Sequence, residues 1–302
     1  MILGVDIGGS HITVAGIETQ NHEILDTNLV SIKVDSTAQA NDIIDNWIYA
    51  LQKSIAISKK EELEGICIAL PGPFDYNRGV FAYTMEHKFT SLYGLNIKKI
   101  IAQRLSLSDN IPLRFYNDAA CFGIGEAWKG KLKFAKKAIA ITLGTGFGTT
   151  FLSEGLPVLH GNGVPKNGEL YNIPFKDGIA DEYFSTRWFI KKYESLTGIT
   201  INGVKDLTNS SEPNICITQV FEEFSCNLAT FLLPWLQGYH VDAIVIGGNI
   251  SKAWDFFAHD LKHKLKNQGC FIKIHQSDLK EKAILLGGAR LVNDTFYKSL
   301  CF

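Results

Sequence analysis

One pattern occurs twice in the chain: an apolar strand, a glycine turn and a second strand. The first copy covers residues 2–17, and Asp6 closes its first strand before the turn at 8–10. The second copy covers residues 139–150 and carries glycine at alternate positions of the turn 144–148. Glycine lets a backbone approach a ligand closely and adopt φ values that side chains disfavour. Successive N–H groups in such a turn can form a concave site for phosphate oxygens.

A single turn of this kind is adequately explained as a tight hairpin. Two of them, the first with an acid at its strand end, favour a two-lobed phosphate clamp. Thr145 and Thr149 would add hydroxyl donors to the second turn. We interpret Asp6 as a residue that holds Mg²⁺ through water, in preference to a simple turn or cap residue, because carboxylates beside phosphates bind this ion.

Length and composition bound the class of protein. The 302 residues are 46% hydrophobic and 20% charged with a net charge of −1, which suits an ordinary globular chain long enough for two domains. There is no basic excess to attract nucleic acid and no apolar run long enough to span a membrane. A strand begins at residue 2, so we expect neither a signal peptide nor a DNA-reading helix-turn-helix. The six cysteines form no CxxC pair, which fits a reducing cytoplasm.

Strands and helices alternate along the sequence, which predicts an α/β fold with a partly parallel sheet. The expected strands are 2–7, 11–19, 24–34, 65–70, 112–116, the hairpin within 139–150, 241–246 and 271–275. The expected helices are 42–57, 96–105, 119–128, 182–197, 217–236, 251–266 and 283–292. Residues 74–94 have no clear period and are interpreted as a surface excursion. Residues 155–181 are irregular and too long for an idle connection.

Asn117 and Asp118 end a strand, at the edge where ligands bind open α/β sheets. Aspartate is a favoured helix N-cap, and Ala119 and Ala120 follow. Asn117 can cap the helix instead and leave Asp118 for chemistry. Glu169 and Glu182 flank the irregular segment, and each taken singly is an ordinary surface charge.

Several motifs follow one another in a fixed order. They are DIGGS (6–10), ALPGPFD (69–75), YNDAA (116–120), GTGFG (144–148), GE (168–169), Glu182 with Ser185, and IGGNIS (246–251). In this order, and over nearly the whole chain, they resemble the ROK family (repressor, open reading frame, kinase), which consists largely of sugar kinases with the actin-like two-lobed fold. The resemblance implies two α/β lobes with a central cleft, covering 1–118 and 119–287, and a C-terminal helix at about 288–302 that packs back on the first lobe. It also implies an ATP-dependent, glucose-like hexose kinase, and we expect a homodimer.

The resemblance assigns a role to each motif. Asp118 would be the general base that takes the proton from a sugar hydroxyl, with ATP as co-substrate and Mg²⁺ at Asp6. The donor phosphates and the nucleotide would contact Asp6, Gly8, Gly9, Ser10, Gly144, Thr145, Gly146, Gly148, Gly247 and Gly248. The sugar would contact Pro71, Gly72, Asn117, Glu169, Asn172 and Glu182.

The chain departs from the family pattern at one position. Many members carry a histidine where Asn172 stands, followed by a cysteine cluster that binds structural zinc, and here no cysteine lies between Cys121 and Cys216. We therefore expect no zinc, and Asn172 either replaces the histidine as a sugar contact or closes an Asx turn.

Two alternatives stay open. The segments GVPKNGEL (163–170) and DEYFS (181–185) are similar to polyphosphate glucokinases, and the basic stretch 129–137 could dock a polyanion. A sugar-binding regulator without catalysis is the other.

Overall fold

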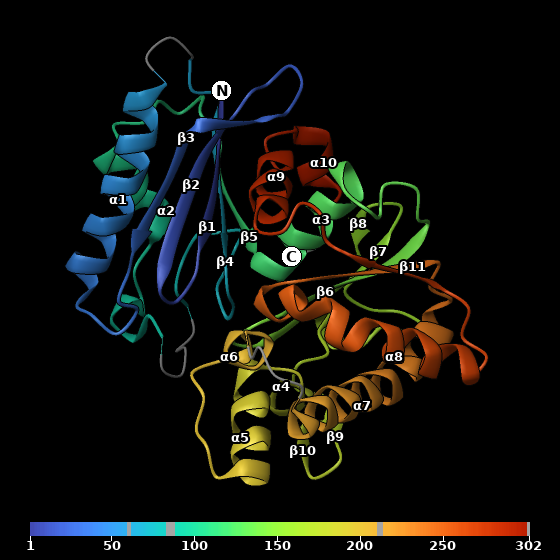
Figure 1. Ribbon diagram of the computed structural model, residues 1–302. Helices are drawn as coiled ribbons and strands as arrows, with labels where there is room; N and C mark the ends of the chain where they lie inside the picture. Colours follow the sequence, from blue (N-terminus) through green and yellow to red (C-terminus); the bar gives the residue numbers. More distant parts are fainter. Residues whose placement is uncertain (59–61, 83–87, 210–213, 301–302) are drawn as a thin grey trace. The chain divides into compact units, whose positions relative to one another are not determined.

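The computed structural model describes residues 1–58, 62–82, 88–209 and 214–300 (Figure 1). The chain forms two compact units, which we call unit 1 (Met1–Lys129 and Glu281–Phe302) and unit 2 (Gly130–Lys280). These boundaries differ from the expected 118 and 287. The reason is that helices α3 (Asp118–Lys129) and α9 (Lys282–Arg290) pack extensively on each other within unit 1.

The sheet of unit 1 has five strands in the order β3-β2-β1-β4-β5. The strands are β1 (Ile2–Ile7), β2 (His11–Ile17), β3 (Ile24–Lys33), β4 (Gly65–Leu70) and β5 (Leu113–Asn117). The first three form an antiparallel meander, whereas β1, β4 and β5 run parallel. β4 is a continuous buried apolar run, and β1 is one except for Asp6, because both faces of the sheet are covered.

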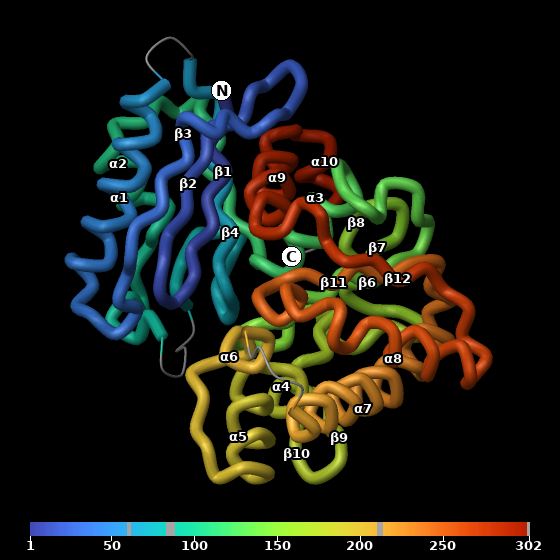
Figure 2. Tube along the Cα trace, in the orientation of Figure 1, coloured from blue at the N-terminus to red at the C-terminus, as the bar shows by residue number. Residues whose placement is uncertain are grey.

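Helices cover both faces of this sheet. α1 (Ala40–Ile57) and α2 (Ile97–Arg104) lie on one face, and α3 and α9 lie on the other (Figures 1 and 2). The short helix α10 (Asp294–Lys298) follows α9. The backbones of α3 and α9 touch: a Cβ on Gly125 would lie 1.9 Å from the Ala283 carbonyl oxygen, and one on Gly287 would lie 1.8 Å from that of Cys121. Glycine is required where helices approach this closely.

The interpretation of residues 74–94 as a surface excursion is wrong for the part that the structure describes; residues 83–87 lie outside it. Phe81, Phe89 and Leu92 are buried, with at most 1% of their surface exposed. Phe89 packs edge-on against Trp47 of α1, with ring centroids 5.6 Å apart, and precedes the 3₁₀ turn Thr90–Leu92. An apolar segment without a period can therefore be core, because aromatic side chains from an irregular backbone fill the space beside the sheet.

The sheet of unit 2 also has five strands, in the order β12-β11-β6-β7-β8. They are β6 (Lys137–Leu143), β7 (Phe147–Ser153), β8 (Leu156–Pro157), β11 (Ala243–Gly247) and β12 (Lys273–Gln276). β6, β11 and β12 are parallel, and β6 and β7 form the antiparallel hairpin around the second glycine turn.

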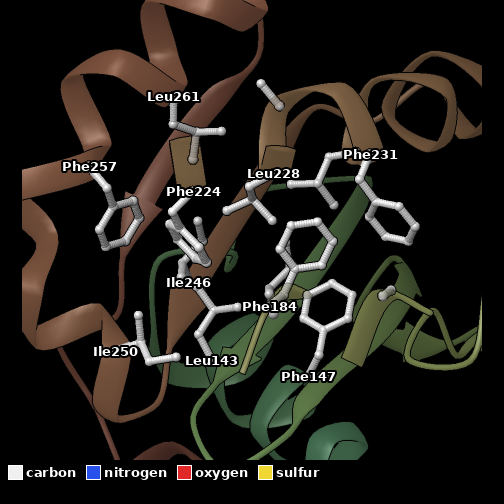
Figure 3. Close-up of a cluster of buried hydrophobic side chains, with 14 of the residues drawn as sticks. Leu143, Phe147, Phe184, Phe224, Leu228, Phe231, Ile246, Ile250, Phe257 and Leu261 are labelled. Atoms are coloured by element: carbon white, nitrogen blue, oxygen red, sulfur yellow. The ribbon is translucent and has the colours of Figure 1, made fainter. Parts of the chain in front are cut away.

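Aromatic side chains dominate the core of unit 2. Phe147 of β7 packs on Phe184 with centroids 5.2 Å apart, and Phe184 packs on Phe231 of α7 (Ile215–Tyr239) at 5.1 Å (Figure 3). Helices α4 (Ala180–Tyr183), α5 (Thr186–Thr197), α6 (Val204–Thr208) and α8 (Trp254–Asn267) also belong to this unit. The residue that follows the glycine turn is thus anchored in the core, which fixes the turn.

The expected helix 182–197 is two helices, α4 (Ala180–Tyr183) and α5, separated by Phe184 and Ser185. The break places the Phe184 ring in the core, and the Thr186 amide and hydroxyl donate to the Gly144 carbonyl at 2.8 and 2.9 Å. Residues 155–181 contain only short elements: β8, the 3₁₀ turns at Lys166–Gly168, and the pair β9 (Pro174–Phe175) and β10 (Gly178–Ile179). No helix within the described ranges is long and apolar enough to cross a membrane.

Candidate active site

The carboxyl ends of three parallel strands bring the polar residues of unit 1 together. Asp6 of β1 lies beside Ala69 of β4, and Leu70 lies beside Asn117 of β5. The register therefore sets Asp6, the loop that begins at Pro71 and the start of α3 along one edge of the sheet, where α/β sheets bind ligands. In that loop, the Tyr76 hydroxyl donates to the Leu70 carbonyl at 3.2 Å. A Cβ on Gly72 would lie 3.2 Å from the same hydroxyl oxygen.

Asn117 caps α3, as its position before the helix predicted. Its Oδ1 accepts from the Ala120 N–H at 3.0 Å, and its Nδ2 donates to the Tyr76 hydroxyl at 3.4 Å. Asp118 is half-buried, and its Oδ1 accepts from the Ala119 N–H at 2.8 Å. Burial raises the pKa of Asp118, while that hydrogen bond and the charge of Lys88 act in the opposite direction. Capping falls on the amide, so the second oxygen of the carboxylate is available to a ligand.

Asp6 is also half-buried. Burial raises its pKa to about 7, and the charges of Asp118 and Glu281 act in the same direction. Acids that raise each other's pKa fit a divalent cation, which relieves their repulsion. Mg²⁺ binds proteins through one or two carboxylates plus water and phosphate oxygens. The part of the chain that the structure describes contains no group of three or more His, Cys, Asp or Glu side chains arranged to hold a metal. The donor set thus fits a phosphate-bound Mg²⁺ held at Asp6.

The turn at Gly8–Ser10 is fixed from two sides. The Gly8 N–H donates to the His11 carbonyl at 2.9 Å, and the Ser10 carbonyl accepts from the Val34 N–H at 2.9 Å. The side chain of Lys88 lies over this turn: its Cε is 3.2 Å from where a Cβ on Gly9 would be. Sequence analysis missed Lys88, since it lies in a segment without periodicity.

In the glycine turn of unit 2, two backbone N–H groups already donate to acceptors within the protein. The Gly144 N–H donates to the Gly146 carbonyl at 3.0 Å, and the Phe147 N–H donates to Asp181 Oδ1 at 2.7 Å. Neither glycine has a positive φ. A Cβ on Gly146 would lie 3.1 Å from the Asp181 carboxylate oxygen, so a side chain there would crowd that carboxylate.

Thr149 is not a phosphate donor, contrary to expectation. It is buried, and its Oγ1 accepts from the Leu170 N–H at 2.9 Å and lies 3.4 Å from the Gly168 carbonyl. Its hydroxyl instead fixes the middle of the irregular segment, at residues 168–170, to β7. Side chains alternate between the two faces of a strand, so Thr149 lies on the same face of β7 as the buried Phe147. The alternation of β7 therefore predicts that Thr149 is buried.

Asp181 and Arg187 form a second feature that sequence analysis missed. The Asp181 carboxylate forms a salt bridge with Arg187, whose Nη1 donates to the Thr145 carbonyl at 3.1 Å. The Asp181 N–H donates to the Tyr171 carbonyl at 2.8 Å. The two charges are six residues apart on either side of a helix break, a spacing that no helical or strand pattern relates.

The expected sugar-contact residues of unit 2 lie in and beside this segment. Glu169 is half-buried. Burial raises the pKa of Tyr171, and the negative charges of Glu169 and Asp181 raise it further. The structure therefore brings Glu169 and Asp181 to the same tyrosine. Asn172 is exposed in the adjacent turn. Glu182 is also exposed, and its Oε2 accepts from the Ile179 N–H at 3.0 Å, so it caps its own helix.

Gly247 is the last residue of β11, which is paired with β6, and Gly248 follows it. Gly248 has φ 82°, and a Cβ on it would lie 2.4 Å from the Leu143 carbonyl oxygen. A Cβ on Gly144 would in turn lie 4.0 Å from the Asn249 nitrogen. The structure thus places the turn after β11 directly against the turn after β6, as two neighbouring strand ends require.

Two mixed sheets flanked by helices, with glycine turns at the ends of their central strands, define the actin-like ATPase fold found in sugar kinases. The crystal structure of a ROK family glucokinase from Streptomyces griseus, in complex with glucose and AMPPNP, has this fold. It is similar to our chain with a TM-score of 0.74 and 20% sequence identity, over 96% of this chain and 98% of that one.

The ROK family model matches residues 2–295, and the chain belongs to this family. A glucokinase from Halalkalibacterium halodurans is 25% identical over 290 residues, covering 86% of this chain and 83% of its own length. A beta-glucoside kinase from Listeria monocytogenes is 24% identical over 296 residues, covering 95% of each chain. Relatives with different sugar acceptors therefore match at similar levels.

Proposed function

We propose that this chain is an ATP-dependent hexose kinase that acts on a glucose-like sugar, with Asp118 as the general base. The observation that carries the proposal is the Asp118 carboxylate itself. It stands at the carboxyl end of β5, on the same edge of the sheet as the glycine turn that follows β1, and is half-buried with a raised pKa. A base is most effective when its pKa lies near the working pH, and burial moves Asp118 in that direction.

The reaction requires few covalent steps from the protein. The sugar hydroxyl oxygen forms a bond to the γ-phosphorus of ATP, the bond from that phosphorus to its bridging oxygen breaks, and ADP leaves. The hydroxyl proton passes to the Asp118 carboxylate, a contribution of about 100- to 10,000-fold in rate. When bound, Mg²⁺ neutralises charge on the donor phosphates.

We assign the remaining predicted residues to binding. The turns at 8–10 and 144–148 and the glycines at 247 and 248 are proposed to bind the donor. The loop from Pro71, with Asn117, Glu169, Asn172 and Glu182, is proposed to bind the sugar. Polyols need several fixed hydrogen-bonding partners, and a site built to pair hydroxyls rejects analogues that lack them.

Polyphosphate is a less favoured donor. The basic stretch 129–137 was the feature that could dock it, yet Lys131 pairs with Asp278 and the Lys137 ammonium stacks on the Tyr239 ring at 4.9 Å. Two of the lysines that could bind a polyanion are therefore already engaged with other side chains of the protein.

The test is a coupled assay in which purified protein is offered hexoses and N-acetylhexosamines, each with ATP and with polyphosphate. We expect turnover with ATP and a glucose-like hexose, abolished in Asp118→Asn. Sugar binding without turnover with either donor would contradict the proposal and indicate a regulator. Turnover with polyphosphate alone would correct the donor.

A further inference from the structure

The side chain of Lys88 covers the phosphate turn of unit 1. Its Cδ and Cε lie 3.3 and 3.2 Å from where a Cβ on Gly9 would be, and the Ser36 hydroxyl lies at 3.6 Å. Lys88 is half-buried and forms no salt bridge with any described residue. Its positive charge acts on Asp118, whose pKa it lowers. A lysine without a salt-bridge partner among the described residues therefore lies over the turn, and its charge acts on the Asp118 carboxylate.

The residue that follows Lys88 fixes its position. Phe89 has a left-handed backbone, with φ 52°, and its ring is buried against Trp47 and Phe81. The Phe89 N–H donates to the Ser36 carbonyl at 2.7 Å. Ser36 itself is buried beside Gly9. The anchor of Lys88 and one wall of the turn are thus parts of the same packed cluster, so the lysine is held over Gly9 by the core of unit 1.

We propose that Lys88 is a further catalytic residue, whose ammonium binds the phosphoryl group that is transferred to the sugar. This inference rests on the proposed kinase function. Phosphoryl transfer depends on positioning and on neutralising the charge of the equatorial oxygens, and an ammonium donates up to three hydrogen bonds to them. Lys88 forms and breaks no covalent bond. Its charge also favours the ionised form of Asp118, which accepts the hydroxyl proton, and so opposes the effect of burial.

The first experiment compares kcat in Lys88→Met, Lys88→Arg and Lys99→Met. Methionine keeps the stem that packs over Gly9 and removes the charge, arginine keeps the charge, and Lys99 is an exposed lysine of α2 that serves as the matched control. We expect Lys88→Met to lower kcat by about 100-fold or more, the typical loss on removing one preorganised donor to a transition state. Lys88→Arg should retain part of the rate and Lys99→Met all of it. A Lys88→Met enzyme as active as the control would overturn the inference.

A pH profile separates catalysis from a purely structural role. The titratable groups that act here are Asp6, Lys88, Asp118 and Glu281. Removing the positive charge of Lys88 raises the pKa of Asp118, so the acid limb of kcat should move to higher pH in Lys88→Met and stay in place in Lys88→Arg. An unmoved acid limb in Lys88→Met, with a lower melting temperature, would show a structural role and overturn the inference.

Binding of inorganic tripolyphosphate, measured by calorimetry with Mg²⁺, tests Lys88 independently of turnover. We expect affinity to fall at least about tenfold in Lys88→Met relative to Lys99→Met, the loss of one charge-assisted contact. If wild type binds tripolyphosphate through Lys88 and phosphorylates no sugar, the kinase proposal fails and the phosphate contact stands. If wild type is an active kinase and Lys88→Met binds tripolyphosphate normally, only the inference on Lys88 fails.

Discussion

The backbone N–H of Phe147 donates to the carboxylate of Asp181 at 2.7 Å. This N–H belongs to the glycine turn that the sequence predicts to bind phosphate, and here it binds a carboxylate of the protein instead. The same carboxylate holds Arg187, and the Asp181 N–H reaches the Tyr171 carbonyl. One residue thus joins the turn after β6 to the segment that carries Glu169 and Asn172, and their conformations are linked within unit 2.

Asp181→Ala should therefore weaken donor binding, although Asp181 itself is not proposed to contact the donor. The substitution leaves the Phe147 N–H without its acceptor and Arg187 without its carboxylate, at a cost of about 1–3 kcal/mol for an unsatisfied buried group. We expect the affinity for a non-hydrolysable ATP analogue, measured by calorimetry, to fall roughly five- to hundredfold. Asp181→Asn keeps an acceptor for Phe147 and should lose less. Equal losses in both variants would show that the charge, and not the hydrogen bond, fixes the turn.

These residues show which parts of the fold and the site can be predicted from the sequence. The sequence predicts strands that correspond to β1, β5 and β6, because buried apolar runs closed by glycine or polar residues are local patterns. The cap on α3 was predicted for the same reason, since a cap acts within three residues. Asp181 lies 34 residues from Phe147, and no local pattern records such a partner.

The same limit explains Lys88 and the break in the helix predicted at 182–197. Lys88 is placed by the packing of Phe89 on Trp47, which brings together α1 and a segment without periodicity. The helix ends at Tyr183 because the Phe184 ring enters the aromatic core and Thr186 bonds to Gly144. Tertiary contacts here override helix propensity, which is only a weak local preference.

Asp118→Asn should lower kcat by at least about 100-fold and leave sugar affinity nearly unchanged. The amide keeps an oxygen that can accept from the Ala119 N–H, so the start of α3 is preserved, yet it cannot take up the hydroxyl proton. With Asp118 as the proposed base, turnover in wild type should require the ionised carboxylate. Because burial raises the pKa of Asp118, the acid limb of kcat should lie above the ordinary aspartate pKa of about 3.9. Steady-state kinetics across pH, with sugar binding by calorimetry, test both statements. A variant that retains a tenth of the rate would assign the base elsewhere.

Asp6 should make the protein less stable as pH rises from about 4 to about 7. Its pKa is raised from 3.8 to about 7 in the folded state, so the native protein holds a proton that the unfolded chain has already lost in this window. The stabilisation is complete below the unfolded pKa and is lost as pH passes through the folded one. Urea unfolding at pH 5 and pH 8 should show this fall in wild type and a smaller fall in Asp6→Asn. Added Mg²⁺ with a nucleotide should stabilise wild type more at pH 8, because the ion competes with the proton. The same pH dependence in both proteins would contradict the role of Asp6.

Gly287→Ala should destabilise unit 1 severely, whereas Gly288→Ala should not. A Cβ on Gly287 would lie 1.8 Å from the Cys121 carbonyl oxygen and 2.8 Å from the Gly125 nitrogen, so two helix backbones would have to separate. Overpacking of this kind costs typically about 1–3 kcal/mol and sometimes more. The neighbouring Gly288 has nothing nearer than 3.6 Å, and alanine there gains up to about 1 kcal/mol of helix propensity. Urea midpoints of the two variants give the comparison. Similar midpoints would mean that α3 and α9 do not touch in solution as described.

Asn172→Ala should weaken sugar binding by about 1–3 kcal/mol, the cost of leaving a hydroxyl partner unpaired. Asn172 stands where the family pattern places a histidine contact, and its side chain is exposed in the turn after Glu169 and so can reach a ligand. The amide does not titrate near neutral pH, so this contact should add no pH dependence to sugar binding, as a histidine would. Asn162→Ala, another exposed asparagine in the irregular segment, is the matched control and should leave the affinity unchanged. The competing explanation is that Asn172 only shapes its turn. An unchanged sugar affinity together with a lower melting temperature in Asn172→Ala would establish that explanation and remove Asn172 from the sugar site.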